Sequence, residues 1–90
     1  MTQPVVVLLP SALADLFPDS DRRVEVNAAT VDEMMDALDR RWPGMRDRLC
    51  DSRPAIRRHI NVFVDGERAT LMTVLKPGTE VYVLTAISGG

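Results

Sequence analysis

Three stretches of the chain alternate apolar and polar residues with a period of two, as strands with one buried face do. They are residues 23–27, 60–64 and 80–85. A fourth stretch, residues 5–9, is apolar throughout and closed by a proline, which predicts a strand inside the sheet with both faces covered. The polar residues 15–22 predict a loop, so the first two strands should form an antiparallel pair.

One segment repeats apolar residues at helical spacing instead, and its apolar stripe consists of Val31, Met34, Met35, Leu38 and Trp42. Thr30 and Glu33 have the spacing of a capping box, and Pro43-Gly44 should end the helix. Asp36 and Arg40 are placed for a four-residue ion pair. A methionine-rich stripe could also form a binding groove, but a single long helix in a small domain must bury such a face against a sheet.

The remaining signals are turns. Asp65-Gly66 predicts a hairpin after the third strand. Lys76-Pro77-Gly78-Thr79 has proline and glycine at the type II positions, residues 45–50 could add a helical turn, and residues 68–74 could hold a short strand. The sequence thus predicts an α+β domain: one sheet of four to five strands with one main helix packed across it.

Alternation in the last strand predicts which side chains face outward. Val81 and Val83 should face the helix, which leaves Tyr82 and Leu84 on the opposite face. There they could form an apolar contact patch. The alternative is that another strand or loop covers them.

Composition limits the classes of function. The 90 residues suit one small domain, with 46% apolar and 27% charged residues. The net charge is −2, so the sequence lacks the excess of basic residues that is typical of nucleic-acid-binding domains. The apolar run 5–9 is too short for a signal peptide, and no stretch approaches a membrane span. We therefore expect a cytoplasmic protein, monomeric when isolated, with no membrane or nucleic-acid partner.

Catalytic and metal-binding patterns are weak. Cys50 is the only cysteine, which excludes an internal disulfide and a thiolate zinc cluster, and we expect an inert thiol. Arg53, Arg57 and Arg58 lie beside His59 in a polar stretch that is either a solvated loop or a docking surface for an acidic partner. The sequence contains no phosphate-binding loop and no convincing Ser/His/Asp or Cys/His set. We expect no metal site and no catalytic activity.

The sequence closes with Ile87-Ser88-Gly89-Gly90 directly behind the last strand. Glycines have no side chain to block a narrow channel, so the Gly90 carboxylate could enter the active site of another protein. Four extended residues at about 3.3 Å each reach about 13 Å. We therefore expect a folded domain over residues 1–86 and a flexible tail over residues 87–90.

The whole pattern resembles the ThiS/MoaD family of ubiquitin-like sulfur carriers. The resemblance rests on the Val-rich first strand, the capped helix, the Asn61-Val62-Phe63-Val64-Asp65-Gly66 hairpin, Pro77-Gly78-Thr79-Glu80-Val81 and the diglycine end. It implies the β-grasp fold with a mixed sheet. Residues 58–64 and 86–90 look more like the cysteine-biosynthesis type of carrier than the thiazole type.

The resemblance also implies a mechanism. A ubiquitin-activating-type enzyme would supply the ATP site and metal ion, adenylate Gly90, and allow a sulfide or persulfide to convert it to a thiocarboxylate. A sulfur-accepting synthase would then use that sulfur, and this chain would bind no cofactor itself. Ile87, Ser88 and Gly89 would lie inside the partner's channel. The resemblance makes Leu84 a candidate for apolar contact with the activating enzyme, and the alternation places Tyr82 on the same outward face.

Two other functions remain open from the sequence. The chain could be a ubiquitin-like binding module with an inert tail, or a modifier that forms isopeptides through Gly90. The pathway that receives the sulfur is also open among cysteine, molybdopterin, thiazole and a specialised metabolite.

Overall fold

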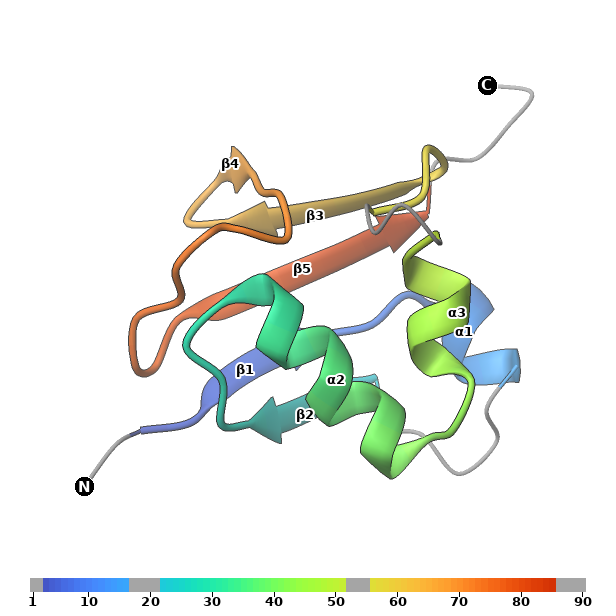
Figure 1. Ribbon diagram of the computed structural model, residues 1–90, viewed down its shortest axis with the longest axis horizontal. Coiled ribbons are helices and arrows are strands. Elements are labelled where there is room, and N and C mark those ends of the chain that lie inside the picture. Colours follow the sequence, from blue (N-terminus) through green and yellow to red (C-terminus); the bar gives the residue numbers. More distant parts are fainter. Residues whose placement is uncertain (1–2, 17–21, 52–55, 86–90) are drawn as a thin grey trace.

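The computed structural model describes residues 3–16, 22–51 and 56–85. In these residues a five-stranded sheet has the strand order β2-β1-β5-β3-β4, with helices packed against it (Figure 1). The elements in chain order are β1 (Val5–Leu8), α1 (Ser11–Leu16), β2 (Arg23–Val26), α2 (Val31–Arg41), α3 (Met45–Leu49), β3 (Ile60–Val64), β4 (Glu67–Arg68) and β5 (Glu80–Thr85). The predicted α+β class, with a mixed sheet and one main helix, is confirmed.

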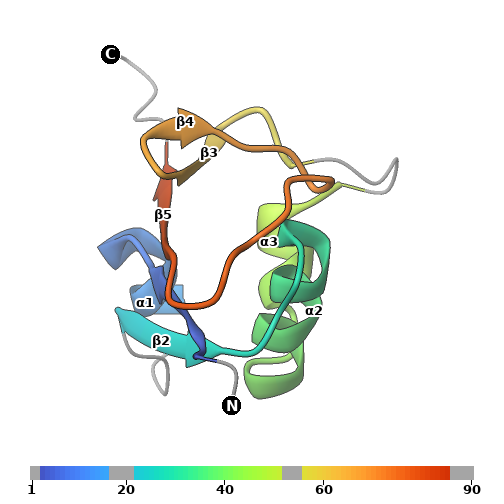
Figure 2. The same cartoon turned by 90° about the vertical axis from the view of Figure 1, so that its left-hand side faces the viewer.

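Strand pairing brings the first and last strands together at the middle of the sheet. β1 runs antiparallel to β2, as predicted, and parallel to β5, while β5 runs antiparallel to β3. The expectation that both faces of β1 are covered is wrong. Val5 and Val7 are buried but Val6 and Leu8 are half-buried, because α2 and α3 lie together on one side of the sheet (Figure 2).

The start of α2 is fixed by its own cap and by a distant loop. Thr30 Oγ1 accepts a hydrogen bond from the Glu33 N–H, as the capping box predicts, while Glu33 Oε1 accepts from the Ala29 N–H one residue before the cap. The backbone N–H groups of Val31 and Asp32 donate to carbonyls of residues 73 and 71. The long loop between β4 and β5 therefore satisfies amides that a helix start leaves unpaired.

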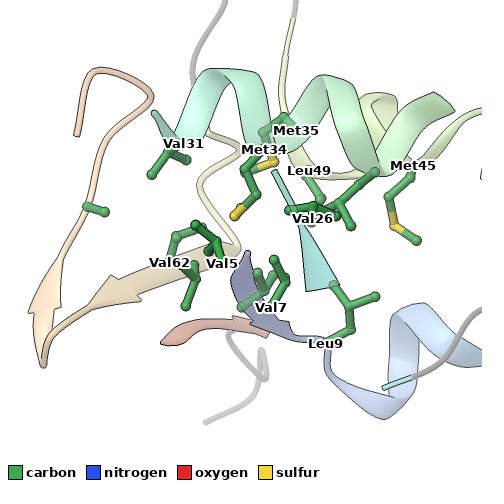
Figure 3. Packing of buried hydrophobic residues seen from close by; sticks show 14 of the residues in the cluster. Val5, Val7, Leu9, Val26, Val31, Met34, Met35, Met45, Leu49 and Val62 are labelled. Carbon is green, nitrogen blue, oxygen red and sulfur yellow. The ribbon is translucent and has the colours of Figure 1, made fainter. Parts of the chain in front are cut away.

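The predicted apolar stripe of α2 forms the centre of the core. Val31, Met34, Met35 and Leu38 are fully buried, and Trp42 is partly buried at the end of the helix. Figure 3 shows Val31 and Met34 directed from α2 toward Val5 and Val62 of the sheet. The methionines of this stripe, Met34 and Met35, therefore pack in the core and do not line a binding groove.

Two local interpretations were wrong. The predicted pair of Asp36 with Arg40 does not form, because Arg46 of α3 reaches back and donates to Asp36 at 3.0 Å. Residues 15–22 were expected to form a loop, but Asp15 and Leu16 belong to α1, a helix that the sequence did not predict. A six-residue helix is too short to show a periodic stripe, and Leu13 is held in it by burial in the core.

Both predicted turns are present. Asp65 and Gly66 have φ values of 53° and 81°, as the hairpin between β3 and β4 requires. In the second turn the Thr79 N–H donates to the Lys76 carbonyl at 3.1 Å, and Gly78 has a φ of 80°. The helical turn expected within residues 45–50 is α3. The short strand expected within residues 68–74 overlaps β4 only at Arg68, because β4 spans Glu67–Arg68.

Candidate functional site

β5 presents two different faces, as its sequence predicts. Val81 and Val83 are fully buried beneath the helices. Tyr82 and Leu84 lie on the opposite face with 44% and 46% of their surfaces exposed. The contact patch expected at these two residues is therefore accessible, and the alternative that other segments cover it is wrong for the described part of the chain.

Strand pairing adds two residues to this patch that the sequence did not single out. Leu8 of β1 and Phe63 of β3 stand beside Tyr82 on either side, and both are half-buried. We define the sheet patch as Leu8, Phe63, Tyr82 and Leu84. The register of β3 against β5 shows that Phe63 adjoins Tyr82.

A shallow groove adjoins the sheet patch. Its volume is about 410 Å³, and residues 8–10, 22–23 and 82–84 line it. The groove lies where β1 ends and α1 begins, beside the part of β5 that leads toward the end of the sequence.

The chemically reactive part of the predicted site lies outside the described residues. This holds for Ile87, Ser88, Gly89 and Gly90, and the boundary expected after residue 86 lies there as well. Their roles stay predictions. What the structure describes is the strand from which they continue: β5 ends at Thr85, one residue after Leu84.

The predicted basic stretch consists of Arg53, Arg57, Arg58 and His59, and its described residues differ in their surroundings. Arg53 lies outside the described residues. Arg57 is half-buried, with its Nε donating to the Asp47 carbonyl at 2.7 Å and its backbone N–H to the Leu49 carbonyl at 2.9 Å. Arg57 therefore holds the following turn against α3, and Arg58 and His59 are exposed beside it.

Cys50 lies in the core, with 3% of its surface exposed. Burial raises the pKa of its thiol, and the nearby Arg46 and Arg57 cations oppose this only in part. A raised pKa leaves little thiolate near neutral pH, and thiolate is the reactive form. This environment agrees with the predicted inert thiol.

A second exposed apolar pair lies away from the sheet patch. Met72 and Val74 are 83% and 69% exposed in the loop between β4 and β5. Hydrogen bonds to Thr70 and Thr73 shape this loop, and its carbonyls bind the start of α2, on the helix side of the sheet (Figure 2). The sequence did not predict this exposed pair, because neither a strand nor a helix period runs through residues 69–75.

Within residues 3–16, 22–51 and 56–85, no group of three or more His, Cys, Asp or Glu side chains is arranged to hold a metal ion. That the chain needs neither metal nor cofactor of its own stays a prediction. In the same residues, none of the helices has the length and apolarity needed to cross a membrane.

The model of the ThiS family matches residues 7–90. The curated proteins give no match.

Three solved structures share the fold over nearly the whole chain. A chain of the BexX/CysO complex from Amycolatopsis orientalis is 31% identical, with a TM-score of 0.85, and the match covers 96% of this chain and 99% of that one. SAMP1 from Haloferax volcanii is 30% identical, with a TM-score of 0.80 and coverage of 96% and 98%. CysO from Mycobacterium tuberculosis is 24% identical, with a TM-score of 0.82 and coverage of 92% and 99%. These likenesses confirm the β-grasp fold.

Proposed function

The chain belongs to the ThiS family, and from this we propose that it is a sulfur carrier whose Gly90 carboxylate is adenylated and then converted to a thiocarboxylate. Family and neighbours together support a ubiquitin-like sulfur carrier or modifier, and small proteins of this kind are not themselves enzymes. The resemblance of residues 58–64 and 86–90 to the cysteine-biosynthesis type of carrier favours a role in cysteine or related sulfur metabolism.

One observation carries the proposal. The accessible residues Tyr82 and Leu84 lie on β5, and the sequence continues directly from β5 into the glycine tail. Tyr82 and Leu84 are exposed while Val81 and Val83 anchor β5 with no exposed surface. Leu84 precedes Gly90 by six residues. A partner that binds the sheet patch therefore has Gly90 within about 20 Å along an extended chain.

The proposed chemistry proceeds in two steps on the partner. A Gly90 carboxylate oxygen attacks the α-phosphorus of ATP, an O–P bond forms, and pyrophosphate leaves. Sulfide or a persulfide sulfur then attacks the glycyl carbonyl carbon, the C–O bond to AMP breaks, and a C–S bond forms. With a persulfide donor, a further thiol must reduce the S–S bond to release the thiocarboxylate.

This chain's residues would provide binding and access in both steps. The sheet patch would dock on the adenylating enzyme, which holds ATP and its metal ion. Gly89 and Gly90 would pass through a channel too narrow for a Cβ. The same tail would later enter a sulfur-accepting synthase.

Intact mass spectrometry tests the proposal. The chain, first shown by mass to end at Gly90, is incubated with ATP, Mg²⁺, a sulfide source and the adenylating enzyme of its source organism. We expect one oxygen to be replaced by one sulfur at the end of the chain. A variant with one residue appended after Gly90 is the control, and it should stay folded and unchanged in mass.

Two results would contradict the proposal. An unchanged mass, while the enzyme converts another carrier, would favour a binding module with an inert tail. Conversion of the extended control would exclude the narrow-channel role of Gly89 and Gly90.

A modifier is the second candidate, and the likeness to SAMP1 favours it. A small archaeal modifier protein of Haloferax volcanii is 27% identical over 94% of this chain. The same adenylate could be attacked by a lysine amine of a target protein, which gives an isopeptide and releases AMP. Protease digestion and mass spectrometry of cell proteins would then find lysines carrying the end of this chain.

A further inference from the structure

One row of side chains crosses all five strands on the face opposite α2. Arg23 of β2 pairs with Leu8 of β1, and Leu8 pairs with Tyr82 of β5. Tyr82 pairs with Phe63 of β3, and Phe63 pairs with Arg68 of β4. The row is therefore an apolar strip of three residues with an arginine at each end.

Both arginines lie at this face. Arg23 is exposed and alternates with the buried Val24. Arg68 is exposed and its Nη2 donates to the side-chain oxygen of Asn61, which stands opposite Leu84. This hydrogen bond holds the Arg68 guanidinium over the sheet, beside the sheet patch and not away from it.

The two cations are separated by the width of the sheet. Neighbouring strands lie about 4.8 Å apart, so the four spacings between β2 and β4 place the two backbone positions about 19 Å apart. Arg23 Nη1 also lies 3.3 Å from Glu25 Oε2, but the two side chains are 61% and 53% exposed. Such an exposed pair contributes little, so Arg23 can exchange Glu25 for a carboxylate of a partner.

Charge differs between the two ends of this face. The next row toward the start of β5 contains Val6 with an acidic residue on each side, Glu25 on β2 and Glu80 on β5. Both glutamates are exposed. An acidic partner surface is therefore repelled by the row at the start of β5 and attracted to the row nearer its end, beside Leu84.

We propose that Arg23 and Arg68 orient the adenylating enzyme on the sheet patch, and that its docking surface is an apolar strip with one carboxylate group on each side, facing the two arginines. The inference rests on the proposed function and deepens it by naming the chemistry of the partner. Apolar contact at Leu8, Phe63 and Tyr82 would supply affinity. Two ion pairs at separate positions would prevent the enzyme from binding the sheet patch in a rotated orientation, and would so direct the tail toward the nucleotide.

ATP–pyrophosphate exchange by the adenylating enzyme tests the inference, with the chain as the varied substrate. We expect Arg23→Glu and Arg68→Glu each to raise KM about tenfold with kcat nearly unchanged, because rim charges act mainly on encounter and orientation. The double variant should raise KM further. Arg23→Gln and Arg68→Gln should have smaller effects, since they remove attraction without adding repulsion.

Arg48→Glu is the matched control, because Arg48 is exposed on α3 and gives the same change in net charge. It should alter KM by less than about twofold. Added salt should raise KM for the original chain and change it little for the double glutamine variant. Thermal unfolding of every variant excludes loss of folding as the cause.

The outcomes separate the two proposals. Normal exchange with an unchanged KM for the folded double glutamate variant, or an equal effect of Arg48→Glu, overturns the orienting role and leaves the sulfur-carrier function standing. A decrease in kcat with KM unchanged also overturns it. If the original chain supports no exchange, the proposed function and this inference fail together.

Discussion

Arg46 Nη2 lies 2.7 Å from Oδ1 of Asp32, so α3 is tied to the first turn of α2. Nη1 of Arg46 also donates to the Asp32 carbonyl at 3.1 Å and to Asp36 Oδ1 at 3.0 Å. The hydrogen bond to Asp32 raises the pKa of the Arg46 guanidinium, which keeps it charged at any ordinary pH. One side chain thus binds two acidic groups and a backbone carbonyl.

We predict that Arg46→Met lowers the free energy of unfolding by about 1 kcal/mol, since the pairs are partly exposed and each contributes modestly. Urea unfolding measures this change. Arg48→Met on the same helix is the control and should change the free energy by less than about 0.5 kcal/mol. Equal effects of the two variants would show that the Arg46 contacts add nothing to stability.

The two exposed apolar surfaces should differ in function. Leu84 and Met72 are both accessible, so replacing either by alanine should change the free energy of unfolding by less than about 0.5 kcal/mol. We predict that Leu84→Ala lowers kcat/KM for adenylation about tenfold, because a central apolar contact is a typical binding hot spot. Met72→Ala should leave it unchanged. The opposite ranking would place the docking surface on the loop between β4 and β5.

Cys50 should make the protein less stable at high pH. Burial raises the pKa of its thiol, so the folded chain holds this proton more tightly than the unfolded chain. The protonated thiol therefore stabilises the fold fully at pH values below the pKa of the unfolded thiol. This contribution to the free energy of unfolding is lost as the pH rises toward and through the pKa of the folded thiol. Urea unfolding from pH 7 to 10 should show this decline, and Cys50→Ala should show less of it.

The same environment predicts the chemistry of this thiol. A thiol reagent at pH 7 should modify Cys50 slowly in the native protein and rapidly in denaturant. Cys50→Ala should still acquire sulfur at Gly90 in the mass assay. Loss of sulfur transfer in a folded Cys50→Ala protein would assign the thiol a role that its burial does not suggest.

Lys76 distinguishes the carrier from the modifier. It is the only lysine in the sequence, and it is exposed in the turn before β5. If activated chains modify one another through side chains, every isopeptide must form at Lys76. We predict that Lys76→Arg abolishes side-chain-linked dimers seen by mass spectrometry and leaves conversion to the thiocarboxylate unchanged. Dimers that persist would have to be linked through the N-terminal amine.

Local patterns predicted most of the elements. The alternation of β5 placed Tyr82 and Leu84 outward because side chains on a strand always point to opposite faces in turn. The start of α2 followed from Thr30 and Glu33, which act on backbone amides only a few residues away. Gly66 and Gly78 marked turns through their freedom to adopt positive φ.

Other features depend on residues that are distant in the sequence. Asp36 was expected to bind Arg40 on its own helix, yet Arg46 of α3 donates to it instead. The loop of residues 69–75 shows no period of its own, and its carbonyls are placed by the amides of α2. α1 is too short for a period to identify, and the burial of Leu13 fixes it.

The sequence by itself determined the inward and outward faces of β2 and β5, the limits of α2, the turns and the family resemblance, because these depend on local backbone geometry and on residue order. The tertiary structure decided which outward-facing side chains of different strands become neighbours. Leu8 and Tyr82 are 74 positions apart in the numbering and become neighbours only through the parallel pairing of β1 with β5. The arginine-flanked row depends on that register, since a shift of one residue would turn Tyr82 and its neighbours to opposite faces of the sheet.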